Sequence, residues 1–159
     1  MIGYDGHKRI NGTKIHAVVT EQSLPVYVTI SAAREHEGRK LIPMMESIGI
    51  TGKGRSGRPR RRPGTLYADT KYDMPLNRFY LARKHIASQI KDSPGKKKRP
   101  GRPRLFDEHA YGRIRSSVER LNAWIKAFRR VATRYGRLPT LYMGFVDLAC
   151  IVIYLRILQ

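Results

Sequence analysis

The 159-residue chain is poor in cysteine and in acidic residues. Its one cysteine, Cys150, excludes an internal disulfide and any zinc cluster built from several cysteines. A single thiol fits a reducing compartment, and we predict a cytoplasmic location. Twelve acids stand against 32 lysines and arginines, which gives a formal net charge of +20. Because a polyanion best neutralises such a field, nucleic acid is the predicted partner.

Long apolar runs are also scarce. The N-terminus has no apolar stretch of the kind found in secretory signals, and we see no terminal lipidation motif. The most apolar run, 141–158, is interrupted by Asp147, which favours a buried helix over a membrane span. An anionic membrane would also suit the charge, but these absences favour DNA and predict no membrane partner.

The hydrophobic patterns predict one mixed α/β domain covering the whole chain. Two β-rich segments, 14–20 and 26–31, are joined by a turn-like link and predict an antiparallel hairpin. The elements predicted after it are a helix over 36–48, a strand over 65–68, a helix over 74–84, a strand over 85–90, a long helix from Asp107 to Gly136 and a last helix over 141–158. The helix over 74–84 is expected to use Leu76, Phe79, Tyr80 and Arg83, and the long helix to bury Ile114, Val118, Leu121, Ile125, Phe128 and Ala132.

Two basic segments punctuated by proline and glycine, 53–64 and 93–104, predict flexible loops within this domain, because they carry no apolar side chain except in Pro residues. Both contain Gly-Arg-Pro-Arg, a pattern similar to the AT-hook, and each loop carries six basic residues. The arginines could enter a narrow minor groove or simply contact phosphates, and the sequence leaves both open. The candidate DNA-binding arginines in these loops are Arg58, Arg60, Arg102 and Arg104.

The twelve acids can be considered one by one. Solvation or helix capping accounts for those in predicted turns and at helix starts, which are Asp5, Glu21, Asp73, Asp92, Asp107 and Glu108. Surface charge beside basic neighbours accounts for Glu35, Glu37 and Glu46, and Asp147 could pair with a base or cap a polar pocket. Asp69 follows a short apolar strand, and Glu119 is the one acid on a helix face that otherwise carries Arg115, Asn122, Lys126 and Arg130. A turn or helix cap at Asp69 and an ion pair of Glu119 with Arg115 remain the simpler alternatives.

Four stretches, in order along the chain, resemble the C-terminal part of DDE transposases of bacterial and archaeal insertion sequences. The stretches are GYDGHK with GTKIH (3–8 and 12–16), LPV through EHE (24–26 to 35–37), LYADTKYD (66–73) and RSSVER (115–120) with Lys126. Tyr111 sits one residue farther from Arg115 than the family signature of tyrosine, arginine, glutamate and lysine has it. The first catalytic Asp of the family belongs on a strand upstream of Gly3, so it is missing from this sequence.

The resemblance implies an RNase H-like fold, truncated at its first strand, with a mixed sheet flanked by helices. It implies catalysis and metal binding by Asp69 and Glu119, with Mg²⁺ or Mn²⁺ as cofactor and with Arg115, Lys126 and Arg130 near bound DNA. It also implies DNA transposition by metal-dependent strand cleavage and transfer on double-stranded DNA. Without the first acid we expect little activity unless an upstream reading frame supplies it, and a homo-oligomer is compatible with the sequence. A non-catalytic DNA-binding protein and a decayed transposase remnant remain the alternatives.

Overall fold

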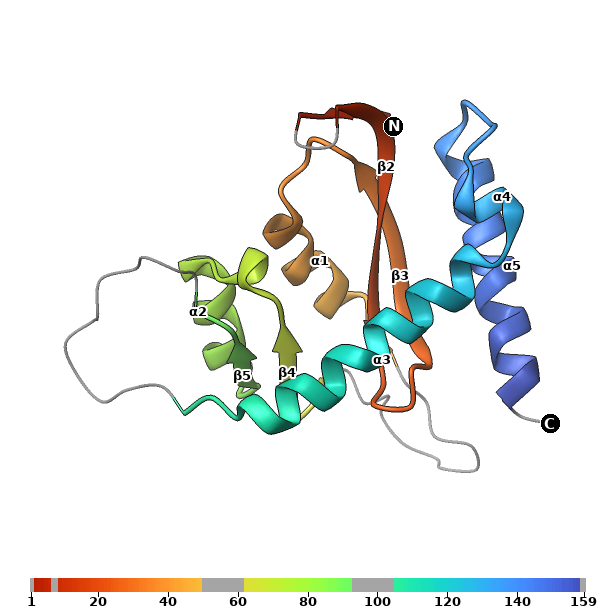
Figure 1. Cartoon of the computed structure of the whole chain (residues 1–159). Helices are drawn as coiled ribbons and strands as arrows, with labels where there is room; N and C mark the ends of the chain where they lie inside the picture. Colours follow the sequence, from red (N-terminus) through yellow and green to blue (C-terminus); the bar gives the residue numbers. More distant parts are fainter. Residues whose placement is uncertain (1, 7–8, 50–61, 93–104, 158–159) are drawn as a thin grey trace. The chain divides into compact units, whose positions relative to one another are not determined.

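The computed structural model describes residues 2–6, 9–49, 62–92 and 105–157 (Figure 1). The chain divides into two compact units, Met1–Glu35 with Ser116–Gln159 and His36–Arg115. The helix α3 (Glu108–Lys126) runs across the boundary, which falls after Arg115. The predicted mixed α/β composition is confirmed, and the described strands form one three-stranded and one two-stranded sheet.

The first unit contains an antiparallel sheet with strand order β1-β2-β3, from β1 (Gly3–Asp5), β2 (Ile10–Val19) and β3 (Pro25–Ala32). The predicted hairpin is confirmed as β2 and β3, whose register pairs His16 with Thr29. The turn between them contains Ser23 at φ 67°, a left-handed conformation that non-glycine residues adopt only when the surroundings hold them. Arg120 of α3 provides such a hold, since its Nε donates to Ser23 Oγ at 3.0 Å.

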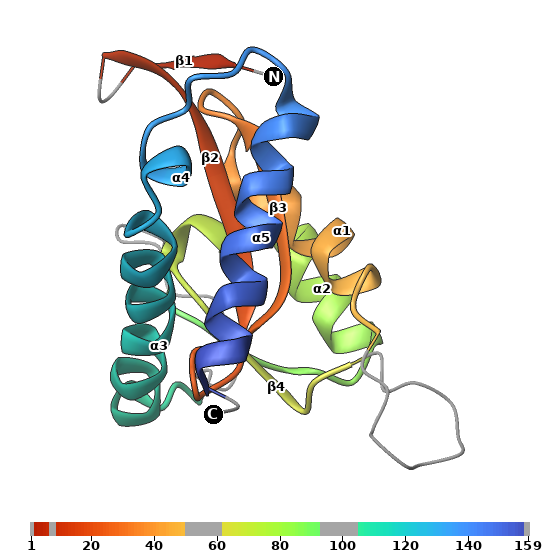
Figure 2. The same ribbon diagram turned by 90° about the vertical axis from the view of Figure 1, so that its right-hand side faces the viewer.

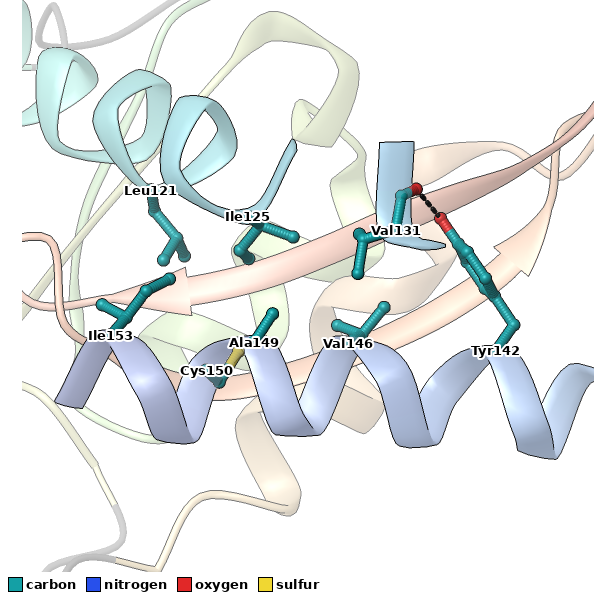
Figure 3. Close-up of a cluster of buried hydrophobic side chains, with 8 residues drawn as sticks. All are labelled: Leu121, Ile125, Val131, Tyr142, Val146, Ala149, Cys150 and Ile153. Carbon is teal, nitrogen blue, oxygen red and sulfur yellow. Dashed lines mark hydrogen bonds between the residues drawn. The ribbon is translucent and has the colours of Figure 1, made fainter. Parts of the chain in front are cut away.

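Three helical segments cover one face of this hairpin: the second half of α3, α4 (Arg129–Ala132) and α5 (Pro139–Ile157). Figure 2 shows α5 lying along β2 and β3. Alternate strand residues point to one side of a sheet, so every second residue of the hairpin packs against the helices. These strand residues are Ile15, Ala17, Val19, Val28 and Ile30. The buried cluster that they cover consists of Leu121, Ile125, Val131, Tyr142, Val146, Ala149, Cys150 and Ile153 (Figure 3).

The predicted long helix is wrong at its C-terminal end, because α3 stops at Lys126 and not at Gly136. Phe128 has an extended backbone (φ −83°, ψ 113°) and starts the separate short helix α4. The break lets Val131 enter the core with 3% of its surface exposed. The predicted stripe also fails in part, since Val118 is 36% exposed and Ala132 is exposed.

The prediction of a buried helix over 141–158 holds for one face of α5 only. The outward face exposes Leu141, Leu148, Ile151 and Leu155, each by more than half. By length and composition α5 is the one helix in the described part of the chain that could cross a membrane, a test that core helices of other proteins also meet. Asp147 lies exposed on this helix, and the described residues form no ion pair with it.

The second unit begins with a 3₁₀ turn, η1 (Glu37–Lys40), and the helix α1 (Leu41–Glu46), which together match the helix predicted over 36–48. The strands β4 (Thr65–Ala68) and β5 (Ala87–Ile90) pair in parallel, with Thr65 opposite Ala87. Between them run η2 (Thr70–Tyr72) and α2 (Pro75–Arg83). The buried apolar residues here include Leu41, Met44, Met45, Ile48, Leu81, Ile86 and Ile90.

The predicted apolar face of α2 is wrong, since Leu76 is 62% and Phe79 66% exposed. The helix instead buries Leu81 and Asn77, which is 2% exposed. The Asn77 amide determines this orientation, because Nδ2 donates to Gly38 O at 2.8 Å and to Tyr72 O at 3.0 Å. Two backbone carbonyls thus obtain the donors that buried polar atoms require.

Asp73 also differs from the prediction of a solvated turn residue. Its side chain is 2% exposed and accepts from Arg78 Nε at 2.6 Å. Arg78 Nη2 donates further to Ile90 O at 3.0 Å and to Asp92 at 2.7 Å. This one guanidinium therefore joins the turn before α2 to the end of β5.

The predicted basic loops lie outside the described residues, apart from residues 62–64. Arg58, Arg60, Arg102 and Arg104 belong to the undescribed part.

Candidate functional site

Asp69 comes directly after β4 and is exposed to solvent. Its Oδ1 accepts from the backbone N–H of Thr70 at 2.7 Å and from the Thr70 hydroxyl at 3.2 Å. The carboxylate therefore caps the 3₁₀ turn η2, as the simpler alternative from the sequence expected. Capping and metal binding are compatible, because hydrogen bonds from neighbours commonly orient a metal-binding carboxylate.

The raised pKa of Tyr72 indicates that a second acid lies near the end of β4. Burial, and then the charges of Glu37 and Asp69, raise the pKa of Tyr72 to about 12. Glu37 from η1 thus lies close enough to act on the same hydroxyl as Asp69. Lys71 Nζ bonds Glu37 Oε1 at 3.1 Å, which partly compensates this negative charge.

The sequence prediction treated Glu37 as surface charge and missed its position beside η2. The stretch Glu35-His36-Glu37 could have indicated a role for Glu37, because it is part of the family resemblance, but the sequence analysis gave it no function. Asn77 holds the two turns together, since its amide bonds one carbonyl of η1 and one of η2. The second unit therefore brings Asp69 and Glu37 into one local environment.

Glu119 lies on α3 in the first unit and is exposed. An α-helix has 3.6 residues per turn, so Arg115, Asn122 and Lys126 follow the same face at offsets of −4, +3 and +7 residues. All three belong to α3, as predicted. The helix thus presents one carboxylate between two cations along about three turns.

Arg130 does not extend this face, contrary to the sequence interpretation, because α3 has already ended at Lys126. It lies on α4, where its guanidinium carbon is 6.0 Å from the ring centre of Tyr135 and 5.5 Å from that of Phe145. Tyr111, which stands one residue away from the family spacing, is 9% exposed and its ring contacts Phe106.

Asp69 and Glu119 belong to different units, so their convergence on one cation stays a prediction. Within the described ranges, no three side chains of His, Cys, Asp or Glu form a group that could hold a metal ion. Carboxylate oxygens are the ligands that hard divalent cations prefer, and both exposed acids offer them. The donor chemistry of the pair therefore fits such an ion.

The mixed α/β architecture places one exposed acid at the end of a parallel strand and a second between two cations on a helix. Comparison with protein families gives the class of protein: residues 2–151 match the model described as the transposase DDE domain. The chain therefore belongs to the DDE transposase family, as the resemblance predicted. Members of this family act on DNA and generally use divalent metal ions.

Two relatives are similar over most of this chain. A Burkholderia cepacia protein named as a transposase for insertion sequence element IS402 is 30% identical over 142 residues. A Brucella ovis protein named as a transposase for insertion sequence element IS6501 is 32% identical over 147 residues. The matches cover 89% and 91% of this chain, and 62% and 98% of the respective relatives. No solved structure matches the chain.

Proposed function

We propose that this chain is the part of a DNA transposase that supplies two of three metal-binding carboxylates, Asp69 and Glu119. The observation that carries the proposal is the placement of Asp69, exposed and oriented by Thr70 at the end of β4. Carboxyl ends of strands are where α/β sheets present functional groups. The RNase H-like arrangement that would bring Glu119 to the same cation is part of the proposal.

The chemistry is cleavage and joining of strands in double-stranded DNA. Bound Mg²⁺ or Mn²⁺ would activate an oxygen nucleophile and stabilise the leaving oxygen. Asp69 and Glu119 would hold the ions. Arg115 and Lys126 flank Glu119 on one helix face, from which their side chains would hold a DNA phosphate beside the carboxylates. Arg58, Arg60, Arg102 and Arg104 would contact the DNA farther away.

We also propose that a third acid, which is not among the residues assigned here, completes the metal site. The chain alone then binds a divalent ion weakly and does little chemistry. This activity would take place in the cytoplasm without a membrane partner, and a homo-oligomer is compatible with it.

Mn²⁺ titration followed by calorimetry tests the metal site of this chain. We expect weak binding that disappears in Asp69→Asn and in Glu119→Gln, because each variant removes a charged ligand. Asp147→Asn is the matched control, since it removes an exposed acid on another helix and should leave binding unchanged. Tight binding that persists in Asp69→Asn would refute the assignment.

A strand-transfer assay separates this function from non-catalytic DNA binding. The chain extended by its upstream reading frame should join DNA ends in the presence of Mg²⁺, and Glu119→Gln should abolish joining while leaving DNA binding intact. An extended chain that binds DNA and joins no ends, with or without Glu119, would favour the non-catalytic alternative.

A further inference from the structure

A cavity of about 220 Å³ opens beside α4 in the first unit. It is lined by Arg130, Tyr135, Gly136, Leu141, Tyr142 and Phe145. All these residues follow α3 in the chain, and none of them is an acid proposed above to hold metal. The cavity is therefore a separate feature of the molecule that needs its own explanation.

The lining combines aromatic rings with one guanidinium. Arg130 lies over the rings of Tyr135 and Phe145, at 6.0 and 5.5 Å between its guanidinium carbon and the ring centres. Tyr135 nevertheless keeps 59% of its surface exposed. An exposed aromatic ring beside a planar cation offers stacking surface to a flat aromatic ligand that is attached to negative charge.

The turn that carries Tyr135 is held in place from both sides. Arg134 donates through Nε to Gly136 O at 2.9 Å and through Nη2 to Arg137 O at 2.7 Å. Its Nη1 bonds the hydroxyl of Thr13 on β2. These bonds tie Arg134, the residue before Tyr135, to the two carbonyls after it and to β2, so they restrain the backbone that carries the ring.

The segment that carries the cavity lining is basic, and the first acid after it is Asp147. Residues 126–146 contain five lysines and arginines and no acid. Lys126, Arg129 and Arg137 are exposed and therefore available to phosphates. A phosphate chain alone would not require the exposed ring, whereas a nucleotide strand uses both ring and cations.

We propose that this cavity receives an unstacked base of the bound DNA, which stacks on Tyr135 while Arg129 and Arg137 hold the adjoining phosphates. The assignment rests on the proposed function for its partner, DNA, and adds a contact to a base. Such a contact is made where a strand is opened, since bases in a duplex are already stacked on each other.

Two single strands of equal length test the assignment at one fixed salt concentration: oligothymidylate and its abasic counterpart, which has the same phosphates without bases. The wild-type chain should prefer the strand with bases. Tyr135→Ala should weaken binding to that strand roughly 5- to 150-fold and leave abasic binding unchanged. Tyr135→Phe keeps the ring and should behave as wild type. Tyr4→Ala removes a similarly exposed tyrosine, 55% against 59%, and should also behave as wild type.

Equal losses on both strands, no loss in Tyr135→Ala, or the same loss in Tyr4→Ala would each overturn the base contact. Failure of this inference and failure of the proposed function remain distinguishable. A chain that binds duplex DNA and shows no base preference contradicts the cavity assignment alone. A chain that binds neither duplex nor single-stranded DNA contradicts both.

Discussion

The Arg78 guanidinium allows a sharp prediction, because it pairs with one buried and one exposed acid. The side chain of Asp73 is 2% exposed and that of Asp92 is 61% exposed, while Arg78 itself is 12% exposed. Removing one partner of a buried ion pair costs about 3–5 kcal/mol, since the remaining charge is left without compensation. An exposed pair contributes only about 0–1 kcal/mol.

Asp73→Ala should therefore destabilise the chain by about 3–5 kcal/mol, discounted somewhat because Asp92 still reaches Arg78, and Asp92→Ala by less than about 1 kcal/mol. With a urea dependence of about 1–3 kcal/mol per molar, the Asp73 variant should unfold at a midpoint lower by roughly 1–5 M. Far-UV circular dichroism in urea measures the unfolding midpoints of both variants. Asp73→Asn keeps an acceptor for Arg78 Nε and should lie between them, which retains a readable variant if Asp73→Ala does not fold.

Equal midpoints for Asp73→Ala and Asp92→Ala would refute the reasoning from burial. A functional consequence follows from the position of Asp73, four residues after Asp69. Loss of its ion pair loosens the turn that orients Asp69, so Mn²⁺ binding should weaken in Asp73→Ala and remain in Asp92→Ala.

Three further predictions concern the pH dependence of two side chains and the salt dependence of DNA binding. The pKa of Tyr72 is raised from 10.0 to about 12, so as pH rises this tyrosine loses its proton in the unfolded chain before it does so in the folded one. Its contribution to the free energy of unfolding is therefore fully present below pH 10 and is lost as pH rises to 12. Urea midpoints at pH 9 and 11.5 should fall more in wild type than in Tyr72→Phe, and parallel falls would contradict this. Burial and, to a smaller extent, the charge of Asp147 raise the pKa of Cys150 from 9.0 to about 11. At pH 8 its thiolate fraction, and therefore its rate of alkylation by iodoacetamide, should be about 100-fold lower than for an ordinary thiol. An alkylation rate equal to that of an ordinary thiol would refute this prediction. If half of the twelve basic residues in 53–64 and 93–104 contact phosphates, a plot of log affinity for duplex DNA against log salt concentration should have a slope of about −5. A slope near zero would exclude a role for these two segments in DNA binding.

The sequence correctly predicted the elements whose signals are local. Two β-rich segments joined by a turn-like link predicted the β2–β3 hairpin, and the run Thr65–Ala68 predicted β4. The family was also readable, because short motifs in a fixed order survive when the rest of a sequence diverges. The location of Asp69 at a strand end followed from these same local patterns.

The predictions that failed depended on contacts between distant residues. Asn77 turns α2 inward because two carbonyls from other elements accept its amide, and no periodicity within α2 encodes that. Likewise α3 ends at Lys126 because Val131 packs against Tyr142 and its neighbours on α5 (Figure 3), although the helical pattern continues in the sequence.

The sequence by itself thus determined the charge, most of the strands and helices in their order, the family and the two candidate acids. Only the tertiary structure decided which faces are buried, that Glu37 and Asp69 act on one tyrosine, and that Arg130 and Tyr135 border a cavity. The physical reason is that propensity and pattern act over a few residues, whereas burial and the partners of a polar group are set by residues far apart in the chain.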